Sequence, residues 1–250
     1  RMPKLEDESA RDRNYVGNVD WVMSDITVTT RADQVPIAPG QLISDVTEGD
    51  RRTARFKSTN PILGFFSVQS AEYAVTKREH TGIDMEIYHH PTHGFNAERM
   101  LDAMAVSLDY FQENFGPYQF DYARVIEFPG YATFAQAFAG TVPYSERIGF
   151  IANTADEDDI DYVTYVTAHE YGHQYWAHQL ISAYMQGGTV MVETMAQYSA
   201  LMVMKEIYGE EQIRRFLKYE LDAYLSSRGS EAIEELPLNR VENQGYIHYR

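Results

Sequence analysis

The sequence AHEYGHQYW at residues 168–176 contains the pattern His-Glu-x-x-His, formed by His169, Glu170 and His173. The pattern around it predicts a helix over residues 159–178. Residues four apart on a helix lie on the same face, about one turn from each other. Both imidazoles can therefore bind one metal ion. Glu170 is rotated away from this pair, so it can accept a proton from a metal-bound water instead of binding the metal itself.

Zinc is the metal that this pattern favours, because two imidazoles, one carboxylate and an open position for water are typical of hydrolytic zinc sites. Glu193 is the best candidate for the carboxylate. It follows His173 by 20 residues, which places it near the first turn of a second predicted helix, where the helix dipole favours an anion. The intervening sequence QGG at residues 186–188 allows a turn between the two helices. We therefore expect one zinc ion held by His169, His173 and Glu193.

A solvated helix face with ordinary polar residues is the competing interpretation, since the His-Glu-x-x-His pattern can arise by chance. The predicted helix and the carboxylate of Glu193 both favour the metal site instead. Three further histidines, His89, His90 and His93, could also bind a metal. Their proline-containing loop and the lack of nearby acidic residues favour a surface loop.

The composition excludes several other classes of function. The 37 acidic residues outnumber the 21 Lys and Arg residues, giving a formal net charge of −16. Such a surface repels phosphate backbones, so we expect no nucleic-acid partner. The absence of cysteine excludes disulfides, thiolate zinc sites and cysteine nucleophiles. No apolar run approaches the roughly 18 residues of a membrane span.

An α+β fold follows from the change in hydrophobic period along the chain. The predicted strands cover residues 21–31, 52–58, 62–75, 83–88, 122–128 and 148–152. The predicted helices cover residues 96–114, 159–178, 189–208 and 211–227. We expect a β-rich segment over residues 1–80 and a catalytic domain over residues 81–250.

Two segments of the chain resemble the aminopeptidase N family of zinc peptidases, which includes leukotriene hydrolase. They are VTAHEYGHQYW at residues 166–176 and VETMAQY at residues 192–198. In that family the glutamate of the second segment completes the zinc site; here the connection that leads to it is slightly longer than usual. The resemblance implies a peptide substrate and a thermolysin-like catalytic domain, truncated at its C-terminus and preceded by the end of a β-sheet domain.

Further segments resemble a bacterial subgroup of the family, in which the peptidase domain is fused to membrane permease segments of the ABC-2 type. They are IEFP at 126–129, PYSE at 143–146, QYSALMVM at 197–204 and YIHYR at 246–250. This resemblance implies membrane segments elsewhere in the full-length chain and an extracytoplasmic position for this part. The chain also starts and stops within a sequence pattern, so we expect it to be a fragment of a longer polypeptide.

The family resemblance bears on two further residues. Tyr249 matches the tyrosine of a Tyr-x-Lys-Gly motif, which stabilises the tetrahedral intermediate. The family's Gly-x-Met-Glu-Asn motif, whose glutamate binds the substrate's free α-amine, should lie shortly before Tyr144, but residues 133–140 read TFAQAFAG. Gln136 is the nearest polar substitute and carries no charge.

Peptide-bond hydrolysis is therefore better supported than aminopeptidase specificity. An endopeptidase or dipeptidase with the same chemistry is one alternative. A binding or structural module of a membrane transporter, with weak or no peptidase activity, is another.

Overall fold

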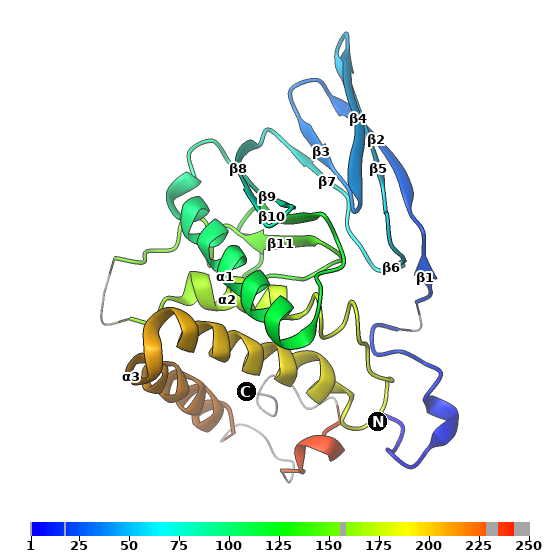
Figure 1. The fold of residues 1–250 in the computed structure, drawn as a ribbon. Coiled ribbons are helices and arrows are strands. Elements are labelled where there is room, and N and C mark those ends of the chain that lie inside the picture. The colour runs from blue at the N-terminus through cyan, green and yellow to red at the C-terminus, as the bar shows by residue number, and fades with distance from the viewer. Residues whose placement is uncertain (1, 18, 156–158, 229–234, 243–250) are drawn as a thin grey trace.

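A four-stranded mixed sheet is the framework of the second part of the chain. In the computed structural model, which describes residues 2–17, 19–155, 159–228 and 235–242, its strand order is β11-β10-β9-β8 (Figure 1). The strands are β8 (Ala74–His80), β9 (Ile83–His89), β10 (Tyr122–Phe128) and β11 (Thr141–Ser145). Strands β9, β10 and β11 are parallel, and β8 pairs antiparallel to β9. The carboxyl ends of the three parallel strands therefore lie at the same edge.

The strands predicted at residues 83–88 and 122–128 are confirmed. Strand β10 is buried along its whole length, in keeping with the apolar side chains at five of its seven positions; Arg124 and Glu127 are its buried charged residues. Strand β11 was not predicted, because Pro143 argues against a central strand; β11 is the last strand of the sheet, where a proline is tolerated. The strand expected at residues 148–152 is wrong. This segment is mainly a turn, in which the Phe150 side chain is fully buried.

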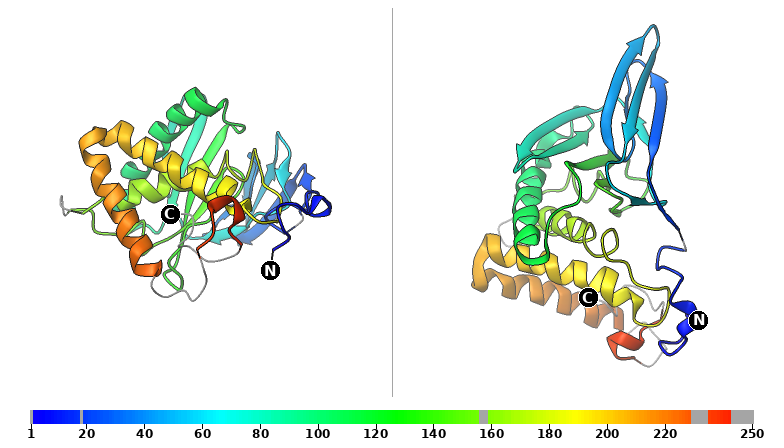
Figure 2. Two further views of the ribbon diagram at one scale, coloured as in Figure 1. Left: turned by 90° about the horizontal axis from the view of Figure 1, so that it is seen from below. Right: turned by 45° about the vertical axis from the view of Figure 1, so that its right-hand side comes forward.

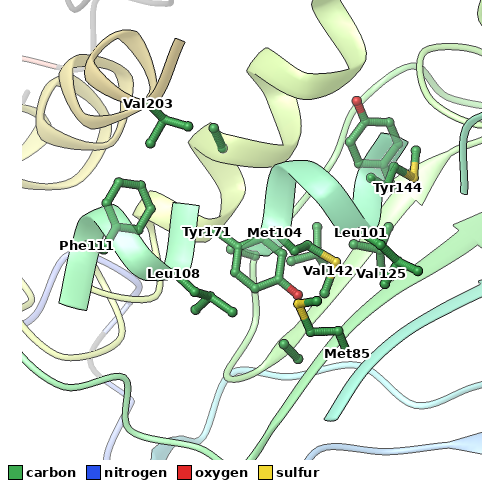
Figure 3. Packing of buried hydrophobic residues seen from close by; sticks show 14 of the residues in the cluster. Met85, Leu101, Met104, Leu108, Phe111, Val125, Val142, Tyr144, Tyr171 and Val203 are labelled. Atoms are coloured by element: carbon green, nitrogen blue, oxygen red, sulfur yellow. The ribbon is translucent and has the colours of Figure 1, made fainter. Parts of the chain in front are cut away.

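Helix α1 (Ala97–Phe115) packs on β8 and β9 and against α2. Its buried side chains recur every three or four residues, as expected for a helix with one apolar face, and they share one hydrophobic cluster with the sheet (Figure 3). The helix predicted at residues 96–114 is thus confirmed. Asn96 precedes it, but the Asn96 side chain donates to the carbonyls of Gly149 and Ala152 and makes no cap bond to the helix.

Helix α2 (Tyr162–Gly172) begins after Asp161, whose side chain accepts a hydrogen bond from the Thr164 amide. The predicted helix of residues 159–178 is therefore correct in place but too long at both ends. After Gly172 the chain passes through short turns, with Ala177 at φ 143°. His173 is the first residue beyond the helix and still has helical dihedral angles, so its side chain keeps the spacing of one turn from His169.

A π-helical turn, η3 (Val190–Thr194), leads directly into the long helix α3 (Met195–Arg228). Gly209 interrupts α3 with φ 79° and ψ 175°, so the two halves correspond to the predicted helices at 189–208 and 211–227. Figure 1 shows α3 lying across α2 on the side away from the N-terminal sheets. Within the described ranges, no helix combines the length and the apolar character that a membrane crossing requires.

The N-terminal part is β-rich, as expected, and consists of three small antiparallel sheets. Its sheets are β1 (Trp21–Val22) with β6 (Ile62–Leu63), β2 (Asp25–Arg31) with β5 (Arg51–Lys57) and β4 (Gln41–Glu48), and β3 (Val35–Ile37) with β7 (Gln69–Ala71). The predicted boundary at residue 80 falls in the hairpin between β8 and β9, which are paired throughout. Sheet pairing thus groups β8 with the second part, and the division of the chain at that point stays a prediction.

Short 3₁₀ turns connect or flank these elements. They are η1 (Glu8–Ala10), η2 (Gly94–Asn96) and η4 (Leu238–Arg240). The N-terminal residues lie beside η4, and Figure 2 shows the two segments together. Ion pairs join Lys4 to Glu242 and Arg240 to Glu6.

A buried arginine connects the N-terminal sheets to the central sheet. Arg124 of β10 is only 4% exposed and donates to the Glu86 carboxylate at 2.8 Å and to the Gly40 carbonyl at 2.8 Å. Its guanidinium also lies over the rings of Phe56 and Tyr122. Because the partners come from β5, β9 and the loop before β4, this residue ties the two parts of the chain together.

Replacing Arg124 by methionine is expected to lower the free energy of unfolding by about 3 kcal/mol. Among the described residues it leaves the buried Glu86 carboxylate with Lys77 as its one cationic partner, beside the hydrogen bond from the Tyr88 hydroxyl. Urea unfolding monitored by circular dichroism measures the change. Arg55→Met is the matched control, since its ion pair with Asp25 is exposed and should contribute little. Equal effects of the two substitutions would contradict the stabilising role of Arg124.

Candidate metal centre

The last turn of α2 brings two imidazoles together. The Nε2 atoms of His169 and His173 are 3.0 Å apart, and the two rings are perpendicular. The Nδ1 atom of His173 lies 3.1 Å from the Trp176 carbonyl. A proton on this Nδ1 leaves the Nε2 lone pair of the neutral ring free for a metal ion. The Nδ1 atom of His169 is buried without a hydrogen-bond partner in the described part of the chain.

Glu193 reaches the same point from the π-helical turn η3. Its Oε2 lies 3.5 Å from Nε2 of His169 and 3.4 Å from Nε2 of His173. Single π-helical turns occur frequently at functional sites. Gly172 permits the approach, because a Cβ atom there would lie 3.2 Å from Cα and O of Ala196, at the start of α3. The structure thus brings together the three residues that the sequence suggested as zinc ligands.

The three atoms fit a zinc ion by distance and by chemistry. Ligands bound about 2.0–2.1 Å from a tetrahedral ion are separated by roughly 3.3–3.4 Å, close to the distances seen here. Two imidazoles and one carboxylate are also a donor set typical of catalytic zinc. All three ligand atoms lie within 4.8 Å of one another.

Electrostatic interactions in this cluster favour its charged forms. Burial opposes protonation of His173, but the Glu193 carboxylate outweighs burial and raises the pKa of His173 to about 9. Burial likewise favours the neutral form of Glu193, yet the two imidazoles hold the pKa of its carboxyl well below its usual range. Without a metal, a proton therefore occupies the site at neutral pH, and a metal ion must displace it.

Glu170 lies beside the three candidate ligands, and it does not belong to their group. Its side chain is 6% exposed, and burial raises the pKa of its carboxyl, with the nearby imidazoles acting in the opposite direction. The backbone amide of Ala137 donates a hydrogen bond to its carboxylate. A carboxylate with a raised pKa next to a metal site is suited to accept a proton near neutral pH.

Two side chains that follow α2 hold residues 137–140 next to Glu170. Burial lowers the pKa of His178 to about 4, so the ring is neutral at pH 7, and its Nε2 lies 3.1 Å from the Ala137 carbonyl. Gln174 is fully buried; its amide donates to the Phe138 carbonyl at 2.9 Å and accepts from the Gly140 amide at 2.8 Å. The segment that hydrogen-bonds Glu170 is thereby fixed to the chain that carries the metal ligands.

A cavity of about 450 Å³ opens onto these residues. Its polar walls include Gln136, His169, Glu170, His173, Glu193 and Glu220. Three of these are carboxylates, and in the part of the chain that the structure describes neither Lys nor Arg lines this cavity. The Gln136 side chain donates to the Ala137 carbonyl at 3.1 Å, so the residue lies in the site as expected but keeps its amide bound to its own loop.

Glu220 is a residue of the cavity that sequence analysis did not identify. It comes from the second half of α3 and is 6% exposed. Its Oε1 accepts a hydrogen bond from the Tyr165 hydroxyl at 3.2 Å, while Oε2 is buried without a hydrogen-bond partner among the residues that the structure covers. The sequence offered one signal, since Phe216 and Glu220 are four residues apart and share the buried face of their helix.

Two other expectations concern Tyr249 and the loop that carries His89, His90 and His93. Tyr249 lies outside the described residues, so its expected role in the site stays a prediction. The histidine-rich loop was expected to lack acidic neighbours, and this is wrong. His93 contacts Glu127 of β10 and Glu146 directly after β11, which follow it by 34 and 53 residues.

Comparison with known proteins identifies similar folds. No protein-family model matches the chain, and no curated protein matches it either. The solved structures include the M1 zinc metallopeptidase of Deinococcus radiodurans and a mutant of that enzyme, each with a TM-score of 0.66 and 17% identity. The matches cover 91% and 90% of this chain but only 49% and 48% of theirs, so the chain spans about half their length. The expected α+β fold class is confirmed, and zinc metallopeptidases share this fold.

Zinc binding to the metal-free protein at pH 7.5 is expected to release about one proton from His173, because its pKa of about 9 keeps it protonated until the metal displaces the proton. The apparent zinc affinity should accordingly rise about tenfold per pH unit as the pH increases toward 9. Calorimetric titrations in two buffers with different ionisation enthalpies measure the released protons. Affinity that does not change between pH 7 and 8.5 would contradict this electrostatic account.

Proposed function

We propose that the chain is the catalytic part of a zinc-dependent metallopeptidase that hydrolyses peptide bonds. The main support is the convergence of His169, His173 and Glu193 on one point, with the carboxylate of Glu170 beside it in the same cavity. The zinc metallopeptidases that share this fold support the same conclusion.

In this proposal His169, His173 and Glu193 hold one zinc ion. When bound, the ion would act as a Lewis acid that lowers the pKa of water and polarises a peptide carbonyl. Glu170 takes a proton from the attacking water and passes it to the leaving amine. The Ala137 amide keeps the Glu170 carboxylate oriented for both transfers. We assign Tyr249 the remaining role, a hydrogen bond to the oxygen on which negative charge develops.

The proposal also specifies the substrate, which is a peptide with a free N-terminus, as for an aminopeptidase. Residues 133–140 lack the glutamate that the family resemblance would lead one to expect there. Glu220 lines the same cavity, and its buried Oε2 has no hydrogen-bond partner among the described residues. Burying an unpartnered carboxylate is costly, and a cationic ligand relieves that cost. We therefore assign Glu220, assisted by Gln136, to the free α-amine of a peptide.

A binding or structural module is the second candidate function. The altered segment at residues 133–140 favours it, because the exopeptidase glutamate is missing there. In that case the module would belong to the extracytoplasmic side of a membrane transporter, with its membrane segments elsewhere in the full-length chain. A zinc-loaded protein that cleaves no member of a diverse peptide library would favour this module over the peptidase.

Glu170→Gln is expected to lower kcat for peptide hydrolysis by about 10²–10⁴-fold while zinc content stays the same, because it removes the proton acceptor and leaves the ligands intact. Cleavage of a fluorogenic peptide library measures activity, and elemental analysis measures zinc. Glu206→Gln is the matched control, since Glu206 is an exposed carboxylate of α3 outside this cavity, and it should keep full activity. Undiminished cleavage by Glu170→Gln would rule out the proposed mechanism.

Glu220→Gln tests the substrate class separately. The loss of a charge-assisted contact with the α-amine, about 1.5–3 kcal/mol, should reduce kcat/KM for peptides with a free N-terminus by about 10- to 100-fold. Hydrolysis of the same peptides with an acetylated N-terminus should be slow in the wild type and unchanged in the variant. If the variant loses activity equally on both kinds of peptide, Glu220 does not recognise the amine.

A further inference from the structure

A second group of potential metal ligands lies at the carboxyl edge of the central sheet. His93 follows β9, Glu127 belongs to β10, and Glu146 directly follows β11. Because these strands are parallel neighbours, their carboxyl ends bring the three side chains together from distant parts of the sequence. Ligand sites in open sheets characteristically form at this edge.

The distances within the group suit a single ion. Nδ1 of His93 lies 2.5 Å from Oε1 of Glu127 and 3.9 Å from Oε2 of Glu146, and one ligand atom from each residue lies within 4.8 Å of the others. Ligands about 2.1 Å from an octahedral ion are separated by roughly 3 Å when adjacent and by roughly 4.2 Å when opposite. One ion can span these three atoms once the His93 and Glu127 atoms separate by about 0.5 Å, a movement that the partly exposed His93 side chain allows.

Backbone amides hold both carboxylates in place. The amide of His90 donates to Oε2 of Glu127 at 2.6 Å, and the amide of Gly130 donates to Oε1 of Glu146 at 2.7 Å. Each carboxylate therefore has one oxygen fixed by the backbone and the other near His93. A Cβ atom at Gly130 would lie 2.8 Å from Oε1 of Glu146, so glycine permits this close approach. Hydrogen bonds of this kind orient the ligands in metal sites.

The charges of the group also call for a cation. The Glu127 side chain is 5% exposed, and in the described ranges neither Glu127 nor Glu146 forms an ion pair with Lys or Arg. The exposed Arg147 side chain passes beside Gly130 but makes no such pair. Two carboxylates thus share one imidazole. Glu146 is 25% exposed, so the cost of burial falls mainly on the Glu127 carboxylate, and a divalent cation would neutralise both.

We propose that His93, Glu127 and Glu146 bind a second divalent cation, separate from the catalytic zinc. The imidazole favours a transition-metal ion such as Zn²⁺ or Mn²⁺ over Mg²⁺ and Ca²⁺, which prefer oxygen ligands alone. The ion takes the place of the proton that His93 shares with Glu127. This site rests on different residues from the proposed hydrolysis, so each can fail without the other.

Metal stoichiometry tests the second site. The protein, without a polyhistidine tag, is stripped with EDTA, equilibrated with excess Zn²⁺, separated from free metal by gel filtration and analysed for zinc. The wild type should retain about two equivalents, whereas His93→Ala and Glu127→Gln should each retain about one. Glu193→Gln should also retain about one, and the combination of Glu193→Gln with His93→Ala close to none. Titration should show the second affinity weakened at least about tenfold in His93→Ala.

Two controls keep the result interpretable. Glu113→Gln removes an exposed carboxylate elsewhere and should retain both equivalents. Circular dichroism checks folding, and His93→Ala carries the test if Glu127→Gln does not fold, since His93 is partly exposed in a loop. A single wild-type equivalent that Glu193→Gln abolishes would overturn the second site and leave the proposed function standing. Two equivalents that persist in both His93→Ala and Glu127→Gln would overturn it as well.

Discussion

The contact between the end of α2 and the start of α3 is the constraint on which the metal centre depends. Gly172 favours this close approach, because a Cβ atom there would lie 3.2 Å from Cα and O of Ala196, tighter than most contacts of a side chain. The approach carries Glu193 to within 3.5 Å of both imidazoles. Behind the contact, Tyr171 and Ala200 are fully buried in the main hydrophobic cluster, so apolar packing fixes the distance between the ligands.

Charge is concentrated in the cavity that borders this packing. The cavity gathers the carboxylates of Glu170, Glu193 and Glu220 with two imidazoles, and without a metal the imidazoles compensate only part of that charge. A dication bound between His169, His173 and Glu193 would stabilise the folded protein by the same interactions that make the metal-free site take up a proton. The hydrogen bonds of Gln174 and His178 with residues 137–140 then connect the candidate metal centre to the cavity wall. The contacts that stabilise the folded protein around the cavity are thus the same ones that position the groups proposed for hydrolysis.

Residue spacing and hydrophobic periodicity in the sequence predicted those elements whose structure depends mainly on residues close together in the chain. The turn-to-turn spacing of His169 and His173, the apolar face of α1 and the buried strand β10 all follow from periodicity. Strand β11 did not, because Pro143 is unfavourable in a strand until neighbouring segments place it at the sheet edge. The carboxylates around His93 were beyond local reasoning, since tertiary packing alone brings them to that histidine. Glu220 left one local signal, its spacing of four residues from the buried Phe216.

Anomalous diffraction at the zinc absorption edge, from crystals of the zinc-loaded protein, tests the central claim most directly. The account predicts a strong peak between Nε2 of His169, Nε2 of His173 and Oε2 of Glu193, at about 2.0–2.2 Å from each, with a coordination position open toward the cavity. The absence of a peak at this point in zinc-loaded crystals would contradict the account.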